Sequence, residues 1–100
     1  MLLHIGADVS IPLERILFVI NERGMTPATK AYIDRARKQR RFTPCAGKAK
    51  SFVVLRERGR EKVVASHIAS STLEKRWRSE ISREYLREAA VLTILEAGEE

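Results

Sequence analysis

The sequence predicts an α+β fold, in which a small, mostly antiparallel sheet packs against two helices and the second helix is extended at the C-terminus. Three observations predict it. Short, β-branched apolar stretches are bounded by Gly and Pro, two such stretches flank a tight turn, and two further stretches have helical spacing behind a capping residue. The 100 residues fit one domain.

Three short strands are expected in the N-terminal part. The first, Leu2–Ile5, is closed by Gly6, and the second, Val9–Ile11, is ended by Pro12, which suits an edge or a bend. Ile16–Ile20 is β-branched and apolar on both faces, so we expect it to be a central strand buried in the sheet.

The first helix is the clearest element. Thr26 is a good N-cap, Pro27 suits the first helical position, and the helix is expected to run to about Gln39. On a helical wheel, one side is mostly apolar and consists of Thr29, Tyr32, Ile33 and Ala36. The opposite side is basic and consists of Lys30, Arg37, Lys38 and Arg41, with Arg35 beside them.

A β-hairpin is expected later in the chain. Its strands are Ser51–Arg56 and Lys62–Ile68, and the connection between them, Glu57–Arg60, is short and contains Gly. Before the hairpin, Phe42–Thr43 is expected to be a short strand and Cys45–Lys50 a loop.

The second helix is expected to begin at Ser70 or Ser71, because Glu74 completes a capping box with Ser71. It is expected to end near Gly98. Its long apolar stripe either docks on the chain's own sheet or contacts another subunit. The residues expected to make an oligomer contact are Trp77, Ile81, Tyr85 and Leu92.

Positive charge is segregated along the chain. The 39 residues from Glu22 to Arg60 contain 12 Lys and Arg against three acids, a net charge of +9, whereas the other 61 residues carry −3. A segregated excess predicts a face that attracts a polyanion, of which nucleic acid is the commonest. The alternative is a solvated basic helix followed by a loop.

The loop Gly47–Lys50 is the most informative part of this basic segment. Lys48 and Lys50 flank a small residue just before a strand, and Gly47 permits close approach of the backbone. Lysine is a flexible point charge suited to phosphate oxygens, so the loop predicts a phosphate contact. The alternative is an ordinary solvated turn.

The sequence argues against an enzyme and against a metal site. His4, Cys45 and His67 are scattered without the short spacing of metal ligands, and His67 lies in a strand pattern that favours a structural role. No recognisable nucleophile-and-base set is present. We therefore expect no catalytic residue, no metal and no cofactor.

Cellular location and aromatic residues give weaker signals. A single cysteine fits a reducing cytosol, and neither a signal peptide nor a membrane-spanning run is recognisable, so we expect a cytoplasmic protein without membrane contact. Phe18 and Phe52 are expected in the core. Phe42 lies beside two arginines and is the one candidate for base stacking, although a core position is favoured for it too.

Four stretches, in their order and spacing, resemble the Rem-type extracellular-matrix regulators of bacteria, and the RemB-like branch more closely than RemA. They are Met1–Val9, Pro12–Ile20, Gly47–Val54 and Ser66–Arg76. The resemblance covers about residues 1–76, which would form a Rem-like α+β core. Residues 77–100 would then be a C-terminal helical extension of the same domain.

The resemblance implies a small DNA-binding protein. RemA-like members assemble into rings that present basic residues to DNA and regulate the transcription of biofilm matrix genes. Their basic loop carries neighbouring arginines, and in this chain Lys48 and Lys50 take that place. Their arginine before the central strand falls at Arg15, which predicts either a phosphate contact or an ion pair between subunits.

The sequence therefore predicts a cytoplasmic, nucleoid-associated homo-oligomer, ring-shaped by the resemblance, that binds double-stranded DNA. The contacts are expected to be mainly with phosphates, because no recognition-helix motif is present. The residues expected to contact DNA are Arg15, Lys30, Arg37, Lys38, Arg41, Lys48 and Lys50. One alternative is an interaction module that assembles with itself or a paralogue and binds DNA weakly or not at all, and an RNA-binding protein is another.

Overall fold

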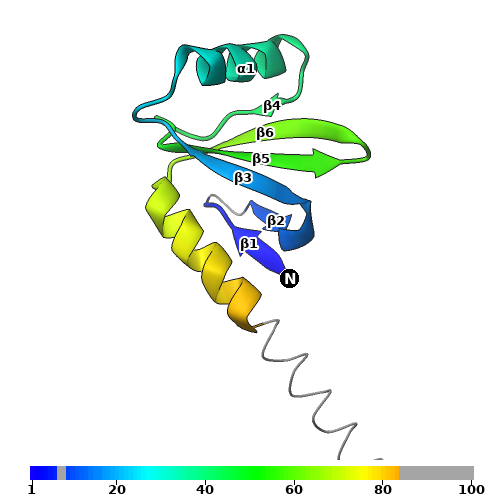
Figure 1. Ribbon diagram of the computed structural model, residues 1–100, viewed down its shortest axis with the longest axis vertical. Coiled ribbons are helices and arrows are strands. Elements are labelled where there is room, and N and C mark those ends of the chain that lie inside the picture. Colours follow the sequence, from blue (N-terminus) through cyan, green and yellow to red (C-terminus); the bar gives the residue numbers. More distant parts are fainter. Residues whose placement is uncertain (7–8, 84–100) are drawn as a thin grey trace, which may run out of the picture.

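The structure, a computed structural model, describes residues 1–6 and 9–83 and has the predicted α+β architecture (Figure 1). Strands β1 (Leu2–His4) and β2 (Ser10–Pro12) form a two-stranded antiparallel sheet. A short 3-10 turn, Leu13–Arg15, leads into strand β3 (Ile16–Asn21). Helix α1 (Pro27–Lys38) follows.

The second half of the chain completes a four-stranded sheet. Its strands are β4 (Phe42–Thr43), β5 (Ser51–Glu57) and β6 (Arg60–Ser66), and the order across the sheet is β3-β5-β6-β4. Neighbouring strands are antiparallel except β4 and β6, which are parallel. A second helix occupies residues 70–83 within the described part of the chain and passes without a break through the boundary at residue 76.

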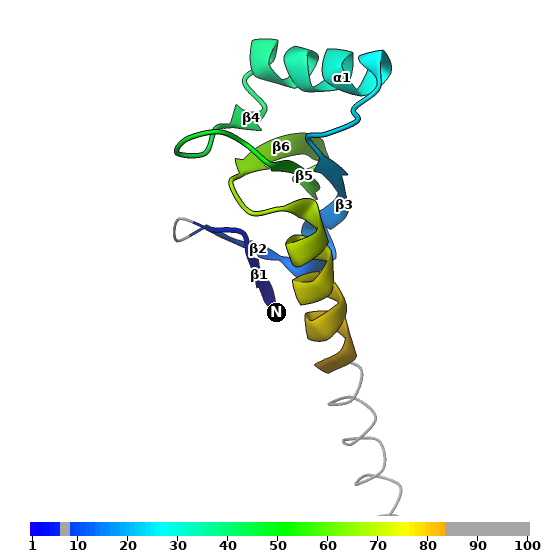
Figure 2. The ribbon, with the colours of Figure 1, turned by 90° about the vertical axis from the view of Figure 1, so that its left-hand side faces the viewer.

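The sheet lies between two layers (Figure 2). Helix α1 covers one face, while the β1–β2 hairpin and the helix at 70–83 cover the other. Side chains of β5 alternate between the two cores. Phe52 and Val54 pack with Ile33 and Ala36 of α1, whereas Val53 and Leu55 pack in the core that also contains Leu3, Ile11 and Leu73.

Local sequence signals explain the ends of several elements. The Thr26 side chain accepts a hydrogen bond from the Thr29 N–H at 3.2 Å, and Pro27 occupies the first turn of α1, as predicted. In the β5–β6 turn, Arg58 and Gly59 have φ angles of 52° and 76°. Two consecutive positive φ angles form the tight turn that suits the twist of an antiparallel hairpin.

The prediction of a central, buried strand at Ile16–Ile20 is wrong. Strand β3 forms an edge of the sheet, and β5 takes the central position. Leu17 is 39% exposed and Phe18 is 47% exposed, so the predicted core position of Phe18 is also wrong. The reason for the exposure of Phe18 is that α1 packs mainly over β4 and β6 and covers β3 only in part, at Ile20.

The second helix begins one or two residues earlier than the predicted capping box implies. The helix begins at residue 70, and the Ala69 carbonyl accepts hydrogen bonds from the N–H groups of Thr72 and Leu73, both at 3.1 Å. Ala69 therefore occupies the cap position that the sequence assigned to Ser70 or Ser71. Both serines lie in the first turn of the helix, where Ser70 is half-buried and Ser71 is exposed.

Ser66 joins the two sheets. Its buried hydroxyl donates to the Ile5 carbonyl at 2.7 Å and accepts from the Ile68 N–H at 3.1 Å. Replacement of Ser66 by Ala is expected to lower the free energy of unfolding by about 1–3 kcal/mol, because buried polar groups lose their partner. Chemical denaturation measures this loss. Ser79→Ala, at an exposed helical position, should leave stability almost unchanged, and equal effects of the two variants would contradict the role given to Ser66.

Candidate nucleic-acid interface

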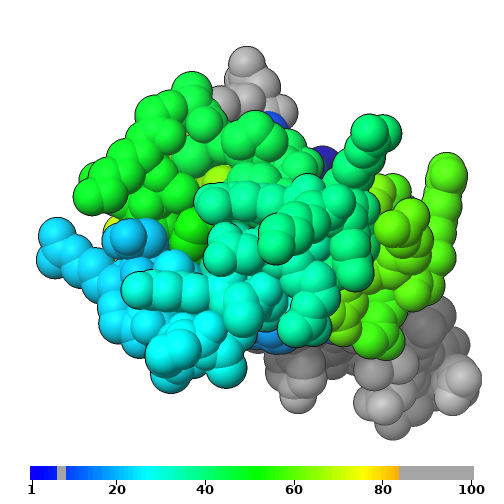
Figure 3. All heavy atoms as spheres, turned by 90° about the horizontal axis from the view of Figure 1, so that it is seen from above, coloured from blue at the N-terminus to red at the C-terminus, as the bar shows by residue number. Residues whose placement is uncertain are grey.

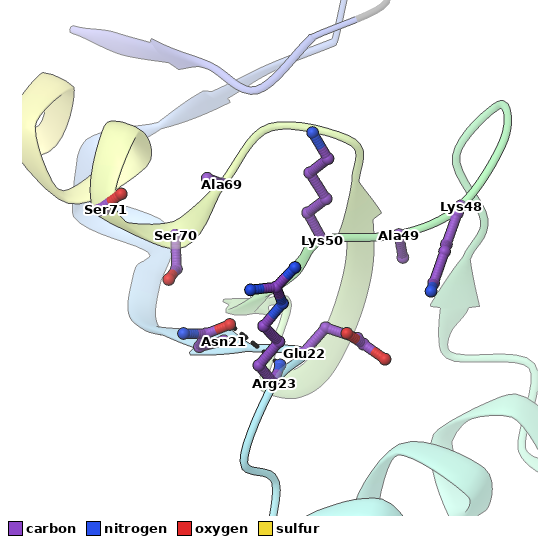
Figure 4. Close-up of a pocket in the computed structure, with 9 residues that line it drawn as sticks. All are labelled: Asn21, Glu22, Arg23, Lys48, Ala49, Lys50, Ala69, Ser70 and Ser71. Atoms are coloured by element: carbon purple, nitrogen blue, oxygen red, sulfur yellow. Dashed lines mark hydrogen bonds between the residues drawn. The ribbon is translucent and has the colours of Figure 1, made fainter.

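Lys48 and Lys50 line a pocket of about 420 Å³, which we call the cationic pocket (Figure 4). Three segments meet there: the end of β3 and the loop after it, the loop before β5, and the start of the helix at 70–83. The lining residues are Asn21, Glu22, Arg23, Lys48, Ala49, Lys50, Ala69, Ser70 and Ser71.

The backbone fixes this pocket through hydrogen bonds on both sides of Lys50. The Glu22 N–H donates to the Lys50 carbonyl at 3.1 Å, and the Lys50 N–H donates to the Ser66 carbonyl at 2.8 Å. On the β3 side, the Arg23 N–H donates to the Asn21 side-chain oxygen at 3.0 Å, which turns the chain out of the strand. The backbone at Lys50 and at Arg23 is therefore held, while both residues are exposed.

The charges in the pocket are arranged to attract an anion. The Arg23 guanidinium extends from its loop into the space between Lys50 and Ser70 (Figure 4). None of the ion pairs among the described residues involves Arg23, Lys48 or Lys50. Glu22 is the one acid among the described lining residues, and its carboxylate extends towards the Lys48 side. Such a group of cations and hydroxyls is suited to phosphate oxygens.

Further cations surround α1. Figure 3 shows α1 between the loop that precedes β5 and the tip of the β5–β6 hairpin. The exposed Lys and Arg side chains of these segments form what we call the basic surface: Lys30, Arg35, Arg37, Lys38, Arg40, Lys48, Arg58 and Arg60. Of these, Arg37 is engaged within the chain, because it pairs with Asp34 at 3.6 Å and lies 4.5 Å from the Phe42 ring centre.

Phe42, the one stacking candidate from the sequence, is half-buried. Its ring centre is 6.2 Å from that of buried Phe52, and the Arg37 guanidinium covers its other side. The ring therefore already has partners within the chain, and the expected core position is confirmed in part.

Arg41 has a structural role in addition to its charge. Its guanidinium donates to the Glu61 carbonyl at 2.7 Å and to the Gln39 side-chain oxygen at 2.8 Å, which ties the end of α1 to β6. Next to it, the Tyr32 hydroxyl donates to the Glu61 carboxylate at 2.5 Å. Burial, and then this hydrogen bond, raise the pKa of Tyr32, and the same bond lowers the pKa of Glu61.

Arg15 is not part of the basic surface. Its guanidinium lies 3.7 Å from the Glu57 carboxylate, in an ion pair within the chain. Glu57 ends β5, whereas Lys50 precedes its first residue, so strand β5 separates Arg15 from the basic loop by about 20 Å. The two sequence candidates with the strongest family resemblance, Arg15 and the loop, are therefore not brought together within the chain.

The predicted oligomer contacts divide into three cases. Trp77 is half-buried against the core that contains Leu3, Ile11 and Leu73, whereas Ile81 is 49% exposed. Both line a groove of about 620 Å³ with Met1, Leu13, Glu14 and Ile16. Tyr85 and Leu92 lie outside the described residues.

Sequence reasoning missed Arg23, Ser70 and Ser71 as members of the cationic pocket. Arg23 was counted in the basic segment, but its loop had no motif that distinguished it from other turns. The serines were interpreted only as helix caps. Their approach to Lys50 depends on the pairing of β5 with both β3 and β6, which no local pattern indicates.

Comparison with known proteins finds no matching family model and no matching curated protein. Within residues 1–6 and 9–83, no helix is long and apolar enough to cross a membrane, and no group of three or more potential ligands could hold a metal ion. The resemblance to Rem-type regulators therefore remains a prediction from the sequence.

We predict that Arg41→Ala lowers the free energy of unfolding by about 1–3 kcal/mol. The substitution removes a charged donor, so the Glu61 carbonyl and the Gln39 side-chain oxygen each lose a hydrogen bond. Arg35→Ala is the matched control, since Arg35 is exposed on α1. Thermal unfolding of both variants measures the difference. If the Arg41 variant is as stable as the Arg35 variant, the structural role of Arg41 is wrong and its charge is available for DNA.

Proposed function

We propose that this protein is an oligomeric DNA-binding regulator that holds double-stranded DNA mainly through backbone phosphates. The observation that carries the proposal is the basic surface together with the cationic pocket beside it. Several exposed cations gathered on one face produce a field that attracts a polyanion, and phosphate contacts of this kind do not depend on base sequence.

The position of the acids supports this function. Glu57 pairs with Arg15 and Lys62, at 3.7 and 3.4 Å, and Glu61 binds Tyr32 and Arg56. These carboxylates are therefore occupied within the chain. The cations at the cationic pocket are left without such partners among the described residues, so they are available to phosphates.

The finer parts of the function rest on the resemblance to Rem-type regulators. It supports regulation of extracellular-matrix genes, a ring-shaped assembly with itself or a paralogue, and a cytoplasmic, nucleoid-associated location. Several subunits that present their basic surfaces to one duplex would multiply the number of phosphates contacted, so the affinity would depend steeply on salt.

The first test replaces both loop lysines. Lys48→Ala with Lys50→Ala should weaken binding to duplexes of unrelated sequence alike, because the lost contacts are with phosphates. The slope of log K against log salt should become shallower by about two for each subunit that touches DNA. Filter binding or fluorescence anisotropy at several salt concentrations gives both quantities.

The control for this experiment removes two positive charges elsewhere. Lys62→Ala with Arg78→Ala changes exposed residues that do not line the cationic pocket. It should keep most of the affinity and the original slope. If the parent protein binds no duplex, or binds one equally at low and physiological salt, the proposed function is wrong.

A second candidate, an interaction module without tight DNA binding, is favoured by one observation. The groove of Trp77 and Ile81 is lined by five apolar residues and by Glu14, and Ile81 is about half exposed near the end of the described helix. A groove of mixed character next to an exposed isoleucine is suited to a partner helix or a second subunit. A protein can both assemble through this groove and bind DNA through the basic surface. The next experiment tests the two functions separately.

Ile81→Glu should reduce the mass of the assembly measured by light scattering, because a charge would be placed in an apolar contact. Ser79→Glu adds the same charge at another exposed position of the helix and should leave the mass unchanged. An unchanged mass for Ile81→Glu would remove this groove from the assembly contacts. A loss of mass with retained affinity for DNA would show that the two functions use different surfaces.

A further inference from the structure

Phe18 is an exposed aromatic residue that lines a pocket on the edge strand β3. Phe18 of β3 is paired with Val54 of β5, and the Val54 side chain lies in the core under α1. Because paired residues point to the same face of a sheet, Phe18 projects from the α1 side of the sheet edge. There it lines a second pocket of about 580 Å³, which we call the aromatic pocket. The other lining residues include Asn21, Arg23, Tyr32 and Glu61.

The aromatic pocket adjoins the cationic pocket. Asn21 and Arg23 line both, so the two hollows are neighbours at the end of β3 and the start of the loop that follows it. One hollow offers the cations of Arg23 and Lys50, and the other offers the faces and edges of apolar and aromatic side chains. A ligand that fills both must therefore carry an anionic group joined to a flat, mostly apolar group.

We propose that the two pockets together bind an unpaired nucleotide, with its phosphate in the cationic pocket and its base against Phe18. Aromatic side chains next to cations are the usual means by which proteins hold unpaired bases, since every base has a π-face and every nucleotide a phosphate. The volumes of both pockets lie within the range of small-molecule sites.

The charges of the lining residues orient the nucleotide. Among the described lining residues, the single cation of the aromatic pocket, Arg23, is opposed by Glu61, whereas the three cations of the cationic pocket, Arg23, Lys48 and Lys50, outnumber the one acid, Glu22. The cationic pocket is therefore the one that attracts a phosphate. Asn21 lies in both pockets. Its side-chain oxygen accepts from the Arg23 N–H, so its amide NH2 group is the part that can donate to the nucleotide.

An unpaired nucleotide has two sources, a free mononucleotide and a single strand of nucleic acid. A duplex is excluded from this mode, because its bases are stacked and paired and do not offer a free face. The inference is thus separate from duplex binding by the basic surface. It requires the Phe18 ring, whereas the proposed function does not.

The experiment titrates the full-length protein with adenosine 5′-monophosphate, adenosine, inorganic phosphate, a single-stranded oligodeoxyadenylate and a duplex. Nuclear magnetic resonance reports which backbone amides respond, and calorimetry gives the affinities. We expect the monophosphate to bind more tightly than adenosine or phosphate, with responses around residues 18–25, 48–50 and 70–71. Tighter binding of the oligonucleotide than of the monophosphate identifies a single strand as the source, and the reverse identifies the free nucleotide.

Two variants test the two halves of the site. Phe18→Leu keeps an apolar side chain but removes the ring, and should weaken monophosphate binding by about fivefold or more while phosphate binding is unchanged. Arg23→Gln should weaken both by about tenfold. Leu17→Ala, an exposed neighbour on the same strand, and Arg78→Gln, an exposed arginine outside both pockets and outside the basic surface, should change neither.

The inference is overturned if the monophosphate binds no more tightly than phosphate, or if Phe18→Leu binds it like the parent. A Phe18→Leu variant that loses assembly mass would also overturn it, because Phe18 would then be a subunit contact. Phe18→Tyr keeps the ring and should retain the affinity, which separates loss of stacking from a general disturbance of the strand. Duplex binding that persists in Phe18→Leu leaves the proposed function intact whichever result the nucleotide gives.

Discussion

The whole arrangement depends on the burial of strand β5 on both faces. Residues 51–55 are all buried, and their side chains alternate between the core under α1 and the core under the second helix. Hydrogen bonds to β3 and β6 hold the strand along both edges. Because β5 belongs to both cores, the loops at its two ends have little freedom to move apart from the rest of the fold.

This constraint explains where the positive charge lies. One end of β5 receives the loop with Lys48 and Lys50, and the other end continues into the hairpin tip with Arg58 and Arg60. Helix α1 lies over one face of the sheet between these two loops (Figure 3), and its Lys and Arg residues are exposed. The acids next to β5 and β6, Glu57 and Glu61, bind Arg15, Arg56, Lys62 and Tyr32, none of which belongs to the basic surface.

The edge position of β3 gives the molecule a second property. An edge strand with exposed apolar residues is a place where proteins bind a partner or a ligand, since its backbone and side chains are incompletely satisfied. In this protein the edge ends at the same loop that supplies Arg23 to the cationic pocket. The aromatic Phe18 and the cation Arg23 thereby become neighbours, although the sequence treats one as core and the other as a loop residue.

Local physical chemistry was sufficient for much of the fold. The cap at Thr26, the proline after it, the apolar side of α1 and the glycine turn of the hairpin act within a few residues, so the sequence by itself determined these elements and the α+β class. The concentration of cations between Glu22 and Arg60 was likewise readable. Only the tertiary structure decided that β5 and not β3 is central, that Arg41 and Arg15 bind acceptors of their own chain, and that Arg23 lines the same pocket as Lys50. Strand order depends on which faces α1 and the second helix cover, and an apolar run looks the same at the edge of a sheet as at its centre.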